Sequence, residues 1–188
     1  MPIQVVVYDP RWPDVFAQIA APIAQQLQTY AVTIEHVGST SVPGLAAKPV
    51  IDMDIVVQHE ADIPAIIANI ATLGYQHRGD LGIAGREAFA APIHLPRHHL
   101  YLGHHTAPSI RNHLLVRDYL RQHPQAVTAY AQLKQHLAHT CGDDIDAYVA
   151  GKSQFLAEIL HTQGMACNDV EAIINQNQPT TYTTPPRP

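Results

Sequence analysis

The stretch IEHVGSTSVPGLAAKPVIDMDIVV, residues 34–57, carries two short apolar segments separated by a turn rich in glycine and serine. The β-branched residues of 32–37 predict one strand, and the apolar run over 49–57 predicts a second. The turn over 38–44 has the composition of segments whose backbone amides and hydroxyl groups bind an anion. The sequence therefore predicts an anion-binding turn between two strands.

Two carboxylates, Asp52 and Asp54, lie in the second of these strands and share one of its faces, because alternate side chains of a strand point the same way. In an apolar setting two carboxylates repel each other unless a cation lies between them. Mg²⁺, or Mn²⁺ in its place, prefers oxygen ligands and keeps phosphate oxygens of the substrate among them. Asp52 and Asp54 are therefore predicted metal ligands and catalytic residues.

The turn and the residue that precedes the second strand supply the predicted phosphate site. It comprises Gly38, Ser39, Thr40, Ser41 and Lys48. A Gly-Ser pair or an Asp-x-Asp motif alone more often marks a turn or a solvated strand edge. The two together, with 12 residues between Ser39 and Asp52 and a strand on each side, favour a functional site.

Beyond this stretch, hydrophobic periodicity and turn residues predict the remaining elements. Helices are expected over residues 12–30, 61–73, 109–122, 124–140 and 143–163, and short strands over 75–77, 86–92 and 97–102. We expect one domain over residues 1–174, with an α/β core over about 1–105 and helices packed on it over about 109–165. The proline-rich tail, 175–188, has almost no large apolar residue and is expected to be disordered.

The composition excludes several classes of protein. With 11 lysines and arginines against 16 aspartates and glutamates, a net charge of −5 and no basic stripe, the chain does not fit a protein that grips long nucleic acid. The two cysteines lack CxxC spacing, no apolar run approaches the length of a membrane span, and the first residues do not resemble a signal peptide. We therefore predict a cytoplasmic protein with no membrane partner. The 13 histidines are unusual, because histidine titrates near neutral pH.

The stretch over residues 34–52 also resembles the signature of the GrpB family, which lies within the nucleotidyltransferase superfamily. The likeness extends over about residues 5–155, through Tyr8-Asp9-Pro10 with Trp12, Gly85-Arg86-Glu87, Arg97-His98-His99-Leu100, Arg117-Asp118-Tyr119-Leu120-Arg121, Tyr130 and Leu133-Lys134. The resemblance implies an α/β (α+β) nucleotidyltransferase-like fold, in which a mixed β-sheet is flanked by helices and the C-terminal helices pack on it. It also implies that the Gly-Ser turn lies on a helix beside the strand that carries the carboxylates.

One departure from the superfamily concerns the third carboxylate, which normally completes the metal site from a later strand. Here the last predicted strand presents Arg97, His99 and Tyr101 on one face and no acid. His99 is therefore predicted to act as a general base or as a ligand. Glu35 and Glu87 are substitutes if the fold brings them in.

Guanidinium groups supply the other predicted phosphate contacts, because they offer paired donors to an anion. Arg86 and Arg97 are expected to form a clamp. For Arg117, a clamp and a structural ion pair with a neighbouring acid are open alternatives. His36, just before the turn, is expected to orient the loop by hydrogen bonding, and His98 is a further candidate.

These residues favour a Mg²⁺-dependent enzyme that binds a nucleoside triphosphate and transfers its nucleotidyl group to a small acceptor. Asp52 and Asp54 would hold the metal, and His99 would take the proton of the acceptor. The alternative is a catalytically degenerate module of the same fold that binds a nucleotide or another metabolite, since the third carboxylate is missing. A third hypothesis is a structural domain that binds a partner through its C-terminal helices.

Overall fold

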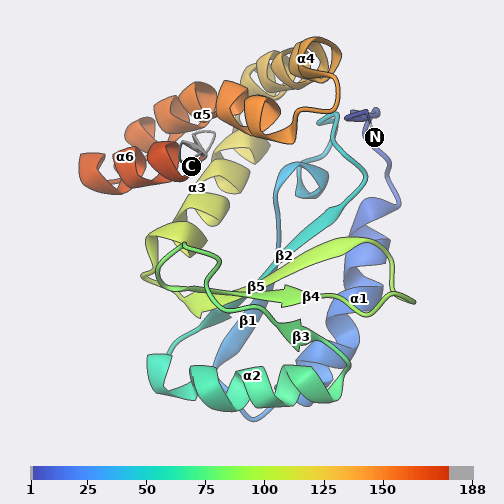
Figure 1. Cartoon of the computed structure of the whole chain (residues 1–188), viewed down its shortest axis with the longest axis vertical. Helices are drawn as coiled ribbons and strands as arrows, with labels where there is room; N and C mark the ends of the chain where they lie inside the picture. The colour runs from blue at the N-terminus through green and yellow to red at the C-terminus, as the bar shows by residue number, and fades with distance from the viewer. Residues whose placement is uncertain (1, 178–188) are drawn as a thin grey trace, which may run out of the picture.

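A five-stranded mixed sheet forms the centre of the structure (Figure 1). The computed structural model describes residues 2–177. The strands are β1 (Val32–Val37), β2 (Ile51–Val57), β3 (Gln76–His77), β4 (Arg86–Ala90) and β5 (His98–His104). They lie in the order β1-β2-β5-β4-β3, in which β2 and β5 run parallel and all other neighbours run antiparallel. The predicted α/β fold with a mixed sheet is confirmed.

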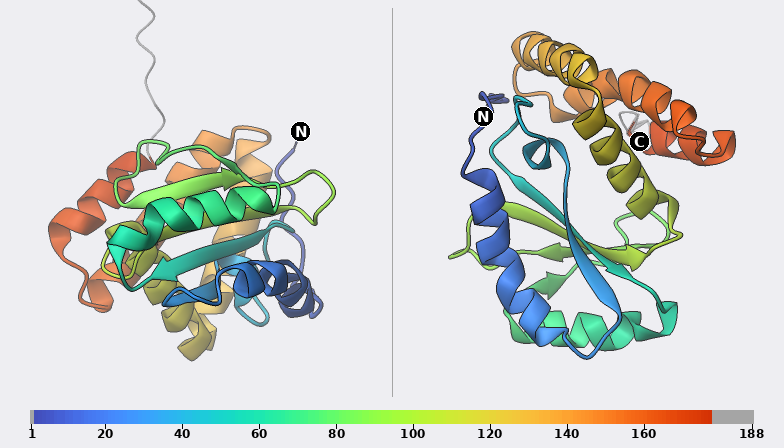
Figure 2. Two further views of the ribbon diagram at one scale, coloured as in Figure 1. Left: turned by 90° about the horizontal axis from the view of Figure 1, so that it is seen from below. Right: turned by 180° about the vertical axis from the view of Figure 1, so that it is seen from behind.

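Helices cover both faces of this sheet (Figure 2). On one face lie α1 (Trp12–Gln26) and α2 (Ile63–Thr72). On the other, α3 (Pro108–Gln122) packs on the sheet and α4 (Pro124–Cys141), α5 (Ile145–Thr162) and α6 (Cys167–Gln176) pack beside it. Short 3₁₀ helices, η1 (Ser39–Ser41) and η2 (Glu60–Asp62), follow β1 and β2. Within residues 2–177, no helix is long and apolar enough to cross a membrane.

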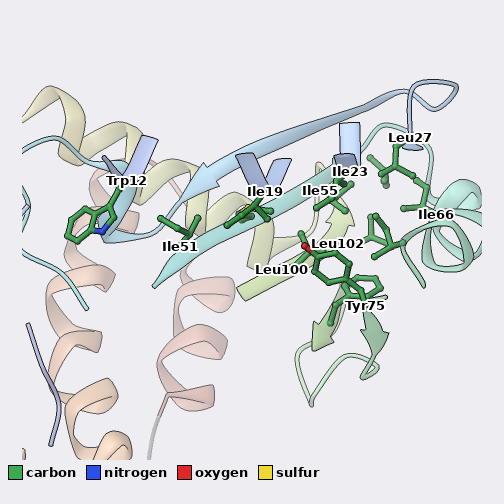
Figure 3. Packing of buried hydrophobic residues seen from close by; sticks show 14 of the residues in the cluster. Trp12, Ile19, Ile23, Leu27, Ile51, Ile55, Ile66, Tyr75, Leu100 and Leu102 are labelled. Carbon is green, nitrogen blue, oxygen red and sulfur yellow. The ribbon is translucent and has the colours of Figure 1, made fainter. Parts of the chain in front are cut away.

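The main hydrophobic core lies between the sheet and the pair α1 and α2 (Figure 3). Side chains of β2, β5, α1 and α2 that are at most 2% exposed form the centre of this core. They are Ile51, Met53, Ile55 and Val57 of β2, Leu100 and Leu102 of β5, Ile19 and Ile23 of α1, and Ile66 and Ile70 of α2. Burying each side chain of this size contributes about 1.5–3 kcal/mol. This face of the sheet therefore supplies much of the free energy of folding.

The opposite face of the sheet is approached closely by α3. A Cβ atom on Gly103 of β5 would lie 2.7 Å from Ile110 Cγ1 and 2.7 Å from the carbonyl oxygen of Gly85. A residue larger than glycine at this position would push the helix away from the sheet. Gly103 thus lets side chains of α3 reach the polar residues of β1 and β2.

The helices and strands predicted from the sequence are all present, with ends shifted by a few residues. The sequence did not predict α6, which is ten residues long and ends at Gln176. Asn175 and Gln176, the first two residues of the predicted disordered tail, are therefore helical, and residues 178–188 lie outside the described residues. The single domain over 1–174 stays a prediction.

Candidate functional site

The polar face of β2 carries Asp52 and Asp54, opposite the face that forms the core. Strand register surrounds them with further polar side chains. Glu35 of β1 pairs with Asp54, and on β5 His99 pairs with Asp52 and Tyr101 with Asp54. Directly paired residues project from the same face of a sheet, so these five side chains share one surface.

Each of the two aspartates accepts a hydrogen bond from a histidine. His99 donates from Nδ1 to Asp52 Oδ1 over 2.8 Å, and His113 of α3 donates from Nδ1 to Asp54 Oδ2 over 2.8 Å. The side chain of Asp52 is 32% exposed, whereas that of Asp54 is 0% exposed. Asp54 Oδ1 is buried and has no hydrogen-bond partner within residues 2–177. Burial lowers the pKa of His113, but the charge and hydrogen bond of Asp54 outweigh it, so this pKa lies above its usual value.

One stripe of α3 holds the site together through three side chains spaced four residues apart. The first is His113, which holds Asp54. The second, Arg117, donates to Glu35 Oε2 over 2.6 Å and to Asp118 Oδ1 over 2.7 Å. The third, Arg121, donates twice to the carbonyl oxygen of Ser41, over 2.9 and 3.1 Å. Because residues at this spacing share one helix face, α3 contacts β2, β1 and the turn at once.

The turn after β1 is built against the first aspartate. Gly38 has a φ of 67°, which favours glycine, and a Cβ atom there would overlap the carboxylate of Asp52. Buried His36 donates from Nε2 to Thr40 Oγ1 over 3.0 Å, and Thr40 in turn donates to the carbonyl oxygen of Val50. Burial lowers the pKa of His36 to about 4, so this imidazole is neutral at pH 7 and orients the turn.

A cavity of about 530 Å³ lies between this turn, strands β2 and β5, and the helices α4 and α5. Its lining includes seven of the residues predicted from the sequence: Ser39, Thr40, Lys48, Asp52, Arg97, His99 and Tyr101. It also includes four residues that were not predicted: His113, Lys134, Tyr148 and Lys152. The fold thus brings Asp52, the turn and several cations to one space, whereas Asp54 is fully buried and does not line the cavity.

The cations of this cavity are partly or fully withdrawn from water. Lys134 is only 2% exposed and donates from Nζ to Ser39 Oγ over 2.8 Å and to the carbonyl oxygen of Ala46. Burial, together with the charge of Lys152, lowers the pKa of Lys134 to about 7. Burial likewise lowers the pKa of Lys152 to about 8, and burial and the neighbouring Arg97 lower that of Lys48. A bound anion would stabilise the charged form of all of them.

Several predicted residues lie outside the cavity. Glu87 projects from the opposite face of the sheet, where it pairs with Leu102 and accepts a hydrogen bond from His77 over 2.6 Å. His98 is buried on the core side and is hydrogen-bonded to the hydroxyl of Tyr75 over 2.8 Å. The structure therefore does not bring these two residues into the site.

Four further predicted residues have contacts of their own. Ser41 donates to the carbonyl oxygen of Gly38 over 2.6 Å and does not line the cavity. Arg86 lies over the ring of Tyr101, 4.4 Å from its centroid, rather than in the cavity lining. Arg117 forms the structural ion pair that was one of its two alternatives. Glu35 reaches the right face but is held by this arginine.

The residues that sequence reasoning missed all come from the C-terminal helices. A signal for three of them, Lys134, Tyr148 and Lys152, exists in the sequence. They belong to two Tyr-x-x-x-Lys pairs, Tyr130 with Lys134 and Tyr148 with Lys152. In each pair the ammonium group lies over the tyrosine ring, 4.6 and 4.7 Å from the centroid. The signal for His113 is its four-residue spacing from Arg117, which belongs to the motif that carries the family resemblance.

The fit of a metal ion depends on these two aspartates. Among the described residues, no group of three or more histidines, cysteines or acids would hold a metal by itself. Asp52 and Asp54 each keep one oxygen that no histidine occupies, and that of Asp54 is buried without a partner. Mg²⁺ is commonly held by one or two carboxylates and takes its remaining ligands from water and substrate phosphates. The two aspartates therefore fit a metal that arrives with a phosphate.

Comparison with known proteins places this arrangement in a family. The family model described as GrpB protein matches residues 2–162. The chain belongs to the GrpB family. A relative in Bacillus subtilis (strain 168), the UPF0157 protein YqkA, is 34% identical over 154 residues, which cover 82% of this chain and 45% of that protein. This GrpB-family chain thus spans less than half the length of that relative.

Solved structures with a similar fold include a member of the same family and a more distant protein. The crystal structure of the conserved protein GrpB from Enterococcus faecalis has a TM-score of 0.74 and 31% identity, and the match covers 90% of this chain and 99% of that chain. The Cid1 poly(U) polymerase, in a crystal structure with MgGTP bound, has a TM-score of 0.52 and 15% identity over 71% of this chain and 44% of that chain. At this identity the likeness to Cid1 shows the fold alone. The GrpB-family fold is thus similar to that of nucleotidyltransferases.

Proposed function

We propose that the protein binds a nucleoside triphosphate together with Mg²⁺ in the 530 Å³ cavity and transfers its nucleotidyl group to a small acceptor. One observation carries this proposal. Asp52, on the polar face of β2, lines the same cavity as the hydroxyl of Ser39 and as four cationic side chains, Lys48, Arg97, Lys134 and Lys152. Carboxylates suit a divalent cation, and the cations suit the phosphates that the cation would accompany.

The metal would be held by Asp52 and Asp54, and Mn²⁺ could take the place of Mg²⁺. When bound, it would neutralise charge on the phosphate oxygens and favour departure of pyrophosphate. The likeness in fold to a polymerase whose structure holds MgGTP supports this choice of ligand. The oxygens of Asp52 and Asp54 that accept no hydrogen bond from a histidine also support a bound metal ion.

The remaining residues have roles that follow from their contacts. Ser39 and the buried amine of Lys134 would bind phosphate oxygens together, because they already lie 2.8 Å apart. Asp52 holds Nδ1 of His99, which fixes the ring and leaves Nε2 to accept the proton of the acceptor. His36 would act indirectly, by holding the turn through Thr40. Electrostatic positioning of this kind supplies most of the rate in phosphoryl transfer.

A second candidate function is a module that binds the metal and nucleotide without turnover. The observation that favours it is the fate of the third carboxylate. Glu35 is the remaining acid on this face, and Arg117 holds it by an ion pair of 2.6 Å. The position that pairs with Asp54 on β5 is Tyr101, which offers a phenol in place of an acid.

Two measurements separate these functions and test both. Each nucleoside triphosphate with Mg²⁺ is first screened for an increase in melting temperature, and a bound triphosphate is then incubated with candidate acceptors while pyrophosphate is measured. We expect stabilisation by at least one triphosphate, and we expect Asp52→Asn and Asp54→Asn to abolish it. Glu87→Gln is the matched control, because Glu87 lies on the same sheet but faces away from the cavity.

The results divide the two functions clearly. Stabilisation with release of pyrophosphate supports the transferase, and stabilisation without pyrophosphate from any acceptor supports the binding module. Unchanged stabilisation in both aspartate variants would contradict the whole assignment.

Cys141 and Cys167 are both free, which suits a reducing compartment, and we place the activity in the cytoplasm.

A further inference from the structure

The contact between Ser39 and Lys134 has a feature that phosphate binding does not explain. Lys134 is buried in α4 at 2% exposure, and its Nζ lies 2.8 Å from Ser39 Oγ. Among the described residues, no carboxylate lies within salt-bridge distance of this amine. A buried ammonium group without a counter-ion is unfavourable, so the neutral amine is the form that this environment favours.

The surroundings of Nζ fit a neutral amine that acts as a hydrogen-bond acceptor. The carbonyl oxygen of Ala46 accepts one N–H of the amine. In the contact as it stands Nζ donates to Ser39 Oγ over 2.8 Å. When the amine is neutral, its lone pair can instead take the hydroxyl proton of Ser39 across the same distance. The ring of Tyr130 lies beneath the amine, 4.6 Å from Nζ to the centroid, and restricts its movement. The serine therefore has a base, and a third group orients that base, as in activated nucleophiles of other enzymes.

Ser39 also faces the space in which an electrophile would lie. It is partly exposed and lines the same cavity as Lys48, Arg97 and Lys152, while its neighbour Thr40 is buried. The cationic lining selects anionic compounds, and phosphate esters and anhydrides are the class that the cavity suits best. The serine hydroxyl, its base and the anion-binding groups thus meet in one place.

We propose that Ser39 and Lys134 form a nucleophile and general base pair, and that Ser39 attacks the phosphorus of a phosphate ester or anhydride bound in this cavity. The Ser39 Oγ forms a bond to phosphorus, and the hydroxyl proton passes to Lys134 Nζ. The bond from phosphorus to the leaving oxygen breaks, and that oxygen departs with the electron pair. The product is a phosphorylated or nucleotidylated serine.

The identity of the natural electrophile rests on the proposed function. If the cavity binds a nucleoside triphosphate, Ser39 attacks its α-phosphorus, pyrophosphate leaves, and the nucleotidyl group stays on Ser39 until the small acceptor takes it. This assigns a base to the first step without the missing third carboxylate. His99 then serves the second step, in which the acceptor loses its proton.

The test uses the full chain and a fluorophosphonate, a probe that reacts with activated serines with loss of fluoride. The adduct is detected by intact mass and located by peptide mapping. We expect one adduct, on Ser39, in the unmodified protein and in Ser41→Ala, the matched control, whose hydroxyl lies on the same turn but bonds Gly38. We expect no adduct at this position in Ser39→Ala. In Lys134→Met and Lys134→Arg we expect the labelling rate to fall by at least about 100-fold. Lys134→Arg keeps the positive charge and removes the base.

The pH dependence of labelling is a readout that a merely structural contact would not change. Two charged groups act on the pKa of Lys134: the charge of Lys152 lowers it, and the charge of Asp52 raises it. With the pKa of Lys134 at about 7, the labelling rate of the unmodified protein should rise about eightfold between pH 5.5 and 6.5 and level off above pH 7.5. This profile decides the matter if the Lys134 variants fail to fold.

The outcomes distinguish this proposal from the proposed function. Absence of any adduct on Ser39, or a labelling rate that is independent of Lys134 and of pH, overturns the pair. Transfer of the nucleotidyl group to an acceptor with release of pyrophosphate, but with no adduct on Ser39 even after incubation with the triphosphate alone, also overturns the pair. It leaves the proposed transferase activity intact. Labelling of Ser39 that depends on Lys134, in a protein that no Mg²⁺-triphosphate stabilises, supports the pair and contradicts the proposed function.

Discussion

The two faces of β2 differ as much as any two regions of the molecule. Toward α1 and α2 the strand presents Ile51, Met53 and Ile55, all at most 2% exposed and packed on apolar neighbours. Toward the C-terminal helices it presents Asp52 and Asp54, each held by one histidine. Because side chains alternate along a strand, seven residues serve both a core and a site. The apolar face stabilises the fold, and the polar face depends on partners from elsewhere in the chain.

The polar face differs from the apolar face because some of its buried polar groups lack a hydrogen-bond partner or a counter-ion among the described residues. Asp54 Oδ1 has no hydrogen-bond partner among the described residues, and burial lowers the pKa of Lys134 and of Lys152. Buried polar groups of this kind reduce stability unless a ligand completes them. A protein that keeps them beside a fully packed core has the local inconsistency expected at a functional site.

The largest effect on stability is expected from the apolar face. Leu100→Ala removes a side chain that is 0% exposed and leaves a cavity between the sheet and the helices α1 and α2. We expect the free energy of unfolding to fall by about 2–5 kcal/mol, measured by urea denaturation. Binding of Mg²⁺-triphosphate by the folded fraction should remain. A loss below about 1 kcal/mol would show that this face is not the main core.

On the polar face, His113→Leu leaves the buried carboxylate of Asp54 with no hydrogen bond from any of residues 2–177. We expect a loss of about 1–3 kcal/mol in the free energy of unfolding near pH 6. The pKa of His113 is raised in the folded state, so its stabilising contribution is complete below its ordinary pKa of 6.5 and is lost as pH rises through the raised value. The difference between the unmodified protein and the variant should therefore shrink as pH increases from 6 to 9. A difference that grows over this range would contradict the pair.

The buried amine should make stability depend on pH in the opposite direction. The pKa of Lys134 is lowered to about 7 from 10.5, so between these values the unfolded chain binds more protons than the folded one. Lys134 alone should therefore make stability rise with pH in this range, by at most about 1.4 kcal/mol per pH unit. Lys134→Met should remove most of the rise between pH 7 and 8, because the pKa of Lys152, at about 8, makes its contribution smaller in this range. Equal slopes in both proteins would show that Lys134 stays charged.

The smallest effect on stability is expected from His99→Ala. The pair of His99 and Asp52 is partly solvated, with side chains 53% and 32% exposed, so its loss should change the free energy of unfolding by less than about 1 kcal/mol. Turnover should nevertheless fall by about 100-fold or more, because the proposed base is gone. Comparison with His113→Leu in the same denaturation experiment separates the two histidines. A larger loss of stability in His99→Ala than in His113→Leu would reverse our account of the two pairs.

Much of the apolar face and about half of the site could be predicted from the sequence. The alternation in β2 revealed that Asp52 and Asp54 share a face, and the turn at Gly38 followed from local composition. These features depend on residues close in the sequence. Lys134 and Lys152 reach the cavity through the packing of α4 and α5, which local periodicity does not determine. His113 similarly depends on Gly103, which sets the distance between α3 and the sheet.

The end of the chain shows the same limit. The sequence of α6 contains only a short apolar stripe, Val170, Ile173 and Ile174, so local periodicity gave a weak signal. Its helix is stabilised by packing, because Leu160 of α5 and Met165 of the connection between α5 and α6 cover that stripe. The sequence could not predict which face of the sheet Glu87 occupies, for another reason. A shift of one residue along β4 moves a side chain to the opposite face, and short strands do not fix that register from sequence.

Calorimetric titration of a non-hydrolysable nucleoside triphosphate tests the central claim most directly, with Mg²⁺ present and absent, on the unmodified protein, Asp52→Asn and Glu87→Gln. We predict saturable binding of one triphosphate in the presence of Mg²⁺, at equal affinity in Glu87→Gln and at least about tenfold weaker in Asp52→Asn or without Mg²⁺. Equal affinity in all three proteins, with and without the metal, would contradict the assignment of the polar face of β2 as a metal and nucleotide site.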